Sequence, residues 1–210
     1  MSKLQSSFPN MALSLITITM ISAAALGFVF ELTKVPIADS QRERQLKAIR
    51  IVTPAFDNSP AREQSLVATS NGDSLIIYPA KRAGNLVGVA VESTTNKGFS
   101  GQIKIMVGFN SDGTIRNYFV LQHAETPGLG SKMQEWFRDS VTASRSVLGL
   151  NPVKILKVKK DGGCVDAITA ATISSRAFLD AINRAYSAYR NYASALTSDN
   201  NLKTEMEAGK

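Results

Sequence analysis

Residues 166–175 read Asp-Ala-Ile-Thr-Ala-Ala-Thr-Ile-Ser-Ser, a run of small side chains that leads into a helix. Downstream, apolar or small residues recur at helical spacing, at Phe178, Ile182, Ala185, Tyr189, Tyr192 and Leu196. Ser174 or Ser175 is expected to cap this helix, because a serine oxygen can accept a hydrogen bond from a first-turn N–H group. Thr172 then lies just before a helix N-terminus, where unpaired N–H groups and the helix dipole favour an anion.

A second stretch, residues 123–130, reads His-Ala-Glu-Thr-Pro-Gly-Leu-Gly. It resembles a signature of the FMN-binding domain family, His-x-Glu-Thr-Pro-Gly-Leu-Gly. The first stretch resembles the flavinylation motif of the same family, Asp-x-x-(Ser/Thr)-Gly-Ala-Thr. The matching residues are Asp166, Thr169, Ala171 and Thr172, and Ala170 stands where the family has glycine. Two specific motifs in the family's order are hard to obtain by chance, so the chain is identified as a member of that family.

The resemblance implies a covalent cofactor. In the family the last threonine of the motif carries FMN through a phosphoester bond, and this threonine corresponds to Thr172. A separate flavin transferase forms the bond, and Asp166 and Thr169 are the positions that we expect this enzyme to read. The expected cofactor-binding residues are Thr172, Thr169, Ala170, Ala171, Glu125, Thr126, Gly128, Leu129 and Gly130.

Several residues in and near the motifs have two interpretations. Alanine at position 170 costs about 1 kcal/mol if the family's glycine has a positive φ angle, and little if that glycine is only small. Glu125 either accepts a hydrogen bond from the flavin ring or braces its own loop. His123 is the only histidine and is expected to be structural rather than a proton shuttle. Trp136 is expected in the core rather than against the flavin, and the lone Cys164 is expected to pack as a small hydrophobe.

Composition limits the classes of function. The 210 residues allow one ordinary domain plus an appendage, and a hydrophobic content of 44% predicts a folded chain. The net charge of +7 could indicate nucleic acid, but the cations are scattered and no aromatic side chains alternate with them. We therefore expect no nucleic-acid partner. One cysteine excludes an intrachain disulfide, and the sequence has no Cys/His cluster for zinc or an iron–sulfur centre.

Residues 11–30 carry no charged side chain and are rich in Leu, Ile, Ala, Val and Phe. Twenty helical residues span about 30 Å, which is the thickness of the hydrocarbon core of a bilayer. The stretch therefore predicts one transmembrane helix that anchors the chain. A cleaved signal peptide is the alternative, because Ala23–Ala25 offers a cleavage site. The apolar run nevertheless continues to Phe30, and Lys3 is the only charged side chain before it.

The charges around this helix and the family resemblance imply opposite orientations. The basic residues cluster after the helix, at Lys34, Arg42, Arg44, Lys47 and Arg50, whereas Lys3 alone precedes it. The positive-inside rule therefore places the following domain in the cytoplasm. The resemblance instead implies the outer, periplasmic face of the cytoplasmic membrane, and large domains translocate largely regardless of charge. We expect a single-pass protein with its FMN domain outside.

The pattern along the chain predicts an α+β fold, a predominantly antiparallel FMN-binding domain with one N-terminal transmembrane helix. The expected segments are a short N-terminal segment (1–10), the transmembrane anchor (11–30), a linker and charged helix (31–64), the FMN-binding domain (65–196) and a polar tail (197–210). A connector is expected at Pro36–Ser40, followed by a helix from Gln41 to about Val52. Strands are expected at 74–78, 86–92, 102–109, 114–122 and 153–158, and helices at 133–137 and from about 174 to 196.

Within the family, the length and single anchor resemble the G subunits of Rnf-type complexes. Those complexes move electrons between ferredoxin and NAD and couple this to Na⁺ or H⁺ transport. The C subunit of the sodium-pumping NADH:quinone reductase is the near alternative, and an anchored assembly module without flavin is a third. The chain has no nicotinamide-binding fingerprint and no acid/base pair with a substrate pocket. We therefore expect an electron-transfer subunit that works with other membrane subunits and does not turn over a substrate alone.

Overall fold

The structure is a computed structural model that describes residues 7–69 and 72–208. The chain forms two compact units, residues 1–44 and 45–210. The predicted N-terminal segment 1–10 lies mostly outside the described residues, and helix α1 begins at Phe8. Each unit is described by itself.

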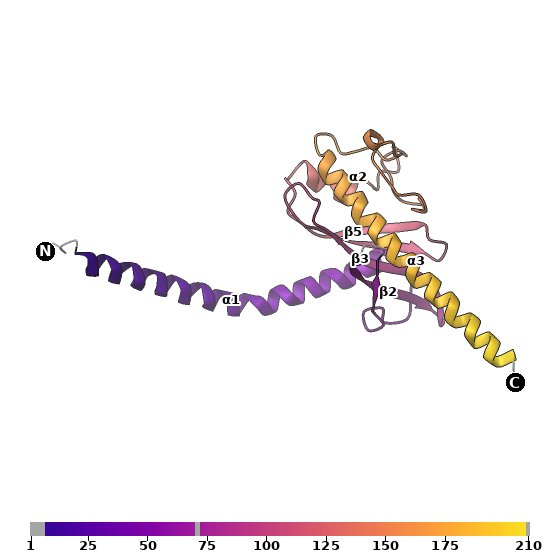
Figure 1. Ribbon diagram of the computed structural model, residues 1–210, viewed down its shortest axis with the longest axis horizontal. Coiled ribbons are helices and arrows are strands. Elements are labelled where there is room, and N and C mark those ends of the chain that lie inside the picture. Colours follow the sequence, from indigo (N-terminus) through magenta and orange to yellow (C-terminus); the bar gives the residue numbers. More distant parts are fainter. Residues whose placement is uncertain (1–6, 70–71, 209–210) are drawn as a thin grey trace. The chain divides into compact units, whose positions relative to one another are not determined.

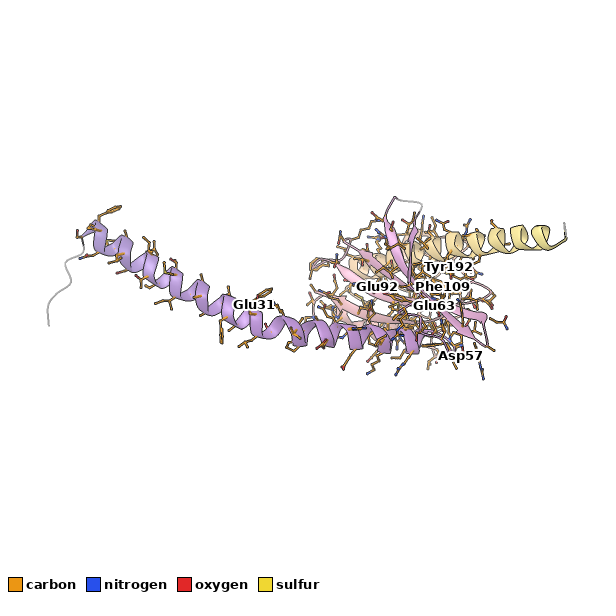
Figure 2. All side chains as sticks on the ribbon, turned by 90° about the horizontal axis from the view of Figure 1, so that it is seen from below. Glu31, Asp57, Glu63, Glu92, Phe109 and Tyr192 are labelled. Carbon is orange, nitrogen blue, oxygen red and sulfur yellow. The ribbon has the colours of Figure 1, made fainter. Side chains whose placement is uncertain are left out.

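Helix α1 (Phe8–Val52) contains 45 residues. In the part of the chain that the structure describes, it is the one helix long and apolar enough to cross a membrane, which is consistent with a single-pass anchor. The first unit exposes apolar side chains throughout, and Figure 2 shows the charged Glu31 on the helix surface. The predicted connector at Pro36–Ser40 is wrong, because α1 continues through Pro36. A proline inside a helix removes one backbone hydrogen bond and usually kinks the helix, and the good helix formers after it let the helix resume.

The second unit is built on a five-stranded antiparallel sheet in which the strands follow chain order. The strands are β1 (Ser65–Ala68), β2 (Ser74–Arg82), β3 (Asn85–Thr95), β4 (Ile103–Asn110) and β5 (Ile115–His123). Four of them confirm predicted strands, with somewhat different bounds. A hairpin turn at Asp112-Gly113 joins β4 to β5, and Gly113 has a φ of 82° there. Short turns of this kind let consecutive strands pair in register.

Helices cover both faces of the sheet. Helix α3 (Thr172–Ala208) crosses one face, as Figure 1 shows. Alternate residues of β4 point into that core, where Phe109 stacks on Tyr189 with ring centroids 5.0 Å apart. On the other face, Ala48, Ile49 and Val52 at the end of α1 pack against the sheet. Figure 2 shows the end of α1 and helix α3 on opposite sides of the sheet.

Three further predictions about elements are corrected by the structure. Residues 153–158 form no strand; Val158 makes a single bridge to Val165, and the Asn183 side chain binds both the N–H and the C=O of Leu156, each at 2.9 Å. Helix α3 starts at Thr172 and continues to Ala208, whereas the sequence predicted a helix from about 174 to 196 followed by a polar tail. The short helix α2 (Met133–Trp136) agrees with its prediction and follows the 3₁₀ turn η1 (Gly130–Lys132).

Candidate functional site

Strand β5 ends at His123 and leads directly into the loop 124–130. The loop turns back on itself, because the Leu129 N–H donates to Thr126 O at 3.2 Å and the Gly128 N–H donates to Ser131 Oγ at 2.9 Å. Gly128 has a φ of 75°, a conformation that suits glycine. The turn is followed at once by η1 and α2, so the loop is held between a strand and a helix.

A tight turn precedes α3. The Ala171 N–H donates to Ile168 O at 3.0 Å, and Ala170 has a φ of 61°. A positive φ at the third position of such a turn is typical of type II, which favours glycine there. The structure thus answers the question about position 170: the family's glycine matches a positive φ, and the alanine of this chain adopts that conformation.

The start of α3 lacks a side-chain cap. The first backbone hydrogen bond of the helix runs from the Ser175 N–H to Ala171 O, at 3.0 Å, so Ala171 is the N-cap residue and offers no side-chain acceptor. The expected serine caps are wrong, because both serines lie inside the first turn and bond elsewhere. The Ser175 hydroxyl accepts from the Ile168 N–H and donates to Ala171 O, each at 2.9 Å. The first N–H groups of the helix, beginning at Thr172, therefore remain available to an anion.

The buried carboxylate of Glu125 joins the two motifs. One of its oxygens accepts from the Ser174 hydroxyl at 2.5 Å, and the other accepts from the Ser100 N–H at 3.1 Å. A Cβ atom added to Gly130 would lie 2.6 Å from Ser174 Oγ and 2.7 Å from a Glu125 oxygen. Glu125 therefore bridges the start of α3 and the loop between β3 and β4, and it also lines the pocket described next.

A pocket of about 320 Å³ lies between the loop that joins β3 to β4, the loop 124–130 and the start of α3. Its lining residues are Phe99, Glu125, Thr126, Leu129, Gly130, Ala170, Ala171, Thr172, Ile173 and Ser174. Seven of the predicted cofactor-binding residues are among them, so the two motifs, more than 30 residues apart in sequence, form one site. Thr169 and Gly128 are exposed and do not line the pocket.

The pocket also contains residues that the sequence did not predict. Phe99 comes from the loop between β3 and β4 and is 67% exposed, and Ile173 is 48% exposed. With Leu129, these side chains place exposed apolar groups on the pocket from three separate segments. In the sequence, the aromatic residue between the glycines of Gly98-Phe99-Ser100-Gly101 is the signal that marks this part of the site.

Asp166, expected to be read by a flavin transferase, lies outside the pocket lining. Its carboxylate accepts from Lys159 Nζ at 2.8 Å and from Ser144 Oγ at 2.5 Å. These hydrogen bonds, first the one from Lys159 and then the one from Ser144, lower the pKa of Asp166 below its ordinary value. The carboxylate therefore stays charged and engaged within its own chain.

The remaining residues singled out in the sequence lie beside the site or away from it. Trp136 is partly buried against the core, as expected, and its indole N–H donates to Asp166 O at 3.0 Å. His123 Nε2 lies 3.3 Å from the Gln134 amide nitrogen, which suits a structural role. Cys164 is exposed, so the expectation that it packs as a small hydrophobe is wrong.

Comparison with known proteins agrees with this geometry. Residues 98–187 match the FMN-binding domain family. The chain is similar to the G subunit of the ion-translocating oxidoreductase complex of Stutzerimonas stutzeri, with 35% identity over 177 residues that cover 83% of this chain and 77% of the relative. It is similar to the corresponding protein of Aliivibrio fischeri strain MJ11, with 33% identity over 182 residues that cover 83% of this chain and 87% of the relative. The chain therefore belongs to the family of the G subunits of ion-translocating oxidoreductase complexes, and it contains an FMN-binding domain.

Proposed function

We propose that this protein carries FMN bound covalently to Thr172 through a phosphoester bond and serves as an electron-transfer subunit of an Rnf-type complex. In such a complex electrons move between ferredoxin and NAD, and the transfer is coupled to Na⁺ or H⁺ transport. The similarity to G subunits of ion-translocating oxidoreductase complexes favours this assignment over the quinone-reductase alternative. The other membrane subunits and a flavin transferase are the partners implied.

One observation carries the proposal: the two motifs line a single pocket that combines apolar side chains with an uncapped helix start. Phe99, Leu129 and Ile173 suit a flat aromatic ring. The start of α3, with no side-chain acceptor on Ala171, suits a phosphate group. A pocket of about 320 Å³ lies within the range of small-molecule sites. The residues present therefore fit both halves of FMN.

The chain's own residues would bind and orient the cofactor. Thr172, the first residue of α3, supplies the hydroxyl that forms the ester. The adjacent N–H groups and the helix dipole stabilise a phosphate by about 0.3–1 kcal/mol at an exposed site. The one carboxylate in the pocket lining, Glu125, accepts hydrogen bonds from Ser174 and Ser100. An unaided threonine hydroxyl is a weak nucleophile, which is why attachment requires a separate transferase.

A tethered flavin suits a relay between neighbouring redox centres. When bound, FMN supplies the redox chemistry, and the protein supplies position and environment. The loop 124–130 and the start of α3 would hold it at a fixed place on a membrane-anchored domain. Electrons would then enter and leave through partner subunits, because the sequence has no nicotinamide-binding fingerprint of its own.

The test is flavin attachment in cells that also express a flavin transferase. The denatured full-length chain should show flavin fluorescence on a gel, and Thr172→Ala should abolish it. Thr169→Ala should weaken attachment without removing its site. Thr197→Ala, a threonine on the same helix but away from the pocket, is the matched control and should fluoresce like the wild type. Fluorescence that survives Thr172→Ala would refute the assignment.

A further inference from the structure

Asp166 lies where three segments meet just before the attachment turn. Its carboxylate binds Ser144 in the loop after α2 and Lys159 in the 3₁₀ turn η2 (Lys159–Asp161). Its backbone N–H donates to Ser144 O at 2.7 Å, and its backbone C=O accepts from the Trp136 indole at 3.0 Å. Asp166 thus makes four hydrogen bonds or ion pairs to three other segments.

One of these segments leads back to the other motif. Trp136 is the last residue of α2, which follows the loop 124–130 through η1. The guanidinium of Arg145 lies 4.2 Å from the centre of the Trp136 ring and covers it, and Arg145 also pairs with Asp139 at 3.0 Å. The indole that holds Asp166 is therefore itself fixed by neighbouring residues. Asp166 connects the attachment turn to the same framework that carries the flavin loop.

The backbone between Asp166 and Thr172 is short and is fixed by hydrogen bonds and by burial of Ile168. Ile168, two residues on, is buried in the core, and its N–H and C=O are bonded to Ser175 and Ala171. The turn at Thr169 and Ala170 follows, and Thr172 begins α3 directly after it. A shift of the chain at Asp166 would therefore be passed to the turn, and with it to the threonine hydroxyl.

The energy of each contact is small, so the main effect of the cluster is on the position of the turn. Lys159 is 53% exposed and the Asp166 side chain 31% exposed, and ion pairs of this kind contribute little to stability. Placement is more sensitive, because an error of about 1 Å at a reacting group can slow a reaction by about a hundredfold. The cluster is therefore better suited to positioning Thr172 than to holding the fold together.

We propose that Asp166 is a positioning residue for flavin attachment: together with Ser144, Lys159 and Trp136, it fixes the turn that presents Thr172. This inference rests on the proposed attachment of FMN at Thr172. It differs from the expectation that the transferase reads the Asp166 carboxylate directly. In the direct case only Asp166 would matter, whereas a positioning role makes attachment depend on its three partners as well.

The experiment measures the initial rate of flavin attachment on the full-length chain with fixed amounts of transferase and of a flavin dinucleotide donor. In this step the Thr172 oxygen bonds to the flavin-side phosphorus, the P–O bond to the second phosphate breaks, the nucleoside monophosphate leaves and the hydroxyl proton passes to solvent. Ser144→Ala and Trp136→Phe leave Asp166 in place but remove its partners' hydrogen bonds, and each should slow attachment by about tenfold or more. Asp166→Asn should have a similar effect. Ile182→Val, a buried change on α3 far from the turn, costs about 0.5–1.5 kcal/mol and should attach flavin at the wild-type rate.

A charge exchange gives a second, independent readout. Asp166→Lys alone should be slow, and Asp166→Lys combined with Lys159→Asp should recover much of the lost rate, because the ion pair is restored with reversed sign. The inference is overturned if Asp166→Asn is slow while Ser144→Ala and Trp136→Phe are normal, or if the exchange recovers nothing. It is also overturned if Ile182→Val is equally slow, since general destabilisation would then explain the effect. A wild-type chain that takes up no flavin would instead refute the proposed function on which the inference depends.

Discussion

At Ala170 the backbone has a φ of 61°, in a region that residues other than glycine rarely adopt. The residue is third in the turn closed by Ile168 and Ala171, and it lines the pocket. The family motif has glycine here, and the turn type explains that preference. This chain tolerates alanine because the side chain is exposed, so the departure from the motif affects backbone energy rather than the shape of the buried core.

We predict that Ala170→Gly stabilises the protein. Relief of the strained conformation gains about 1–2 kcal/mol, and the greater freedom of glycine in the unfolded chain offsets about 0.4–1 kcal/mol of this. The net increase in the free energy of unfolding should be about 1 kcal/mol or less, measured by urea denaturation.

Ala83→Gly is the matched control, because Ala83 has a φ of 51° in the turn between β2 and β3. It should give a similar gain in stability and leave flavin attachment unchanged. A loss of stability for Ala170→Gly alongside a gain for Ala83→Gly would contradict the strain argument.

The elements show what the sequence could and could not predict. Strands β2 to β5 were predicted because polar and apolar residues alternate between clear turn signals, a local pattern. The segment 153–158 has similar residues, but the Asn183 side chain satisfies the backbone of Leu156 in place of a neighbouring strand. The two motifs predicted most of the pocket. Phe99 was missed because only the tertiary fold brings the β3–β4 loop to the start of α3.

The end of α1 packs so closely against β4 that there is no room for a side chain at Gly108. A Cβ atom added to Gly108 on β4 would lie 1.9 Å from the backbone oxygen of Val52. Because neither backbone can move freely, Gly108→Ala should destabilise the domain by about 1–3 kcal/mol. For a chain of this size this corresponds to a fall in Tm of roughly 2–12 °C, measured by circular dichroism.

Gly27→Ala provides the control, since a Cβ atom at Gly27 would meet nothing within 4 Å and alanine favours a helix. It should not lower Tm. An unchanged Tm for Gly108→Ala would show that the end of α1 is not packed against β4 as described.

At the scale of the whole molecule, one helix serves two purposes. Its first part is apolar and exposed over the length of a bilayer, and its last residues belong to the core of the flavin domain. Both parts therefore belong to the single helix α1.

The orientation of the FMN-binding domain across the membrane can also be predicted. The positive-inside rule favours the cytoplasm, because Lys34, Arg42 and Arg44 follow the apolar stretch closely. The rule is strongest for short loops, however, and here a whole domain of more than 150 residues follows. We therefore predict the outer face, in agreement with the family resemblance. A reporter that is active only outside the cytoplasm, fused after Lys210, should be active, and a reporter that is active only in the cytoplasm should be silent at the same place.

The control removes positive charges that follow the apolar stretch. Replacing Lys34, Arg42 and Arg44 by glutamine should leave the activity of both reporters unchanged. The reverse pattern of reporter activity would show that the charges decide the topology and that the flavin domain faces the cytoplasm.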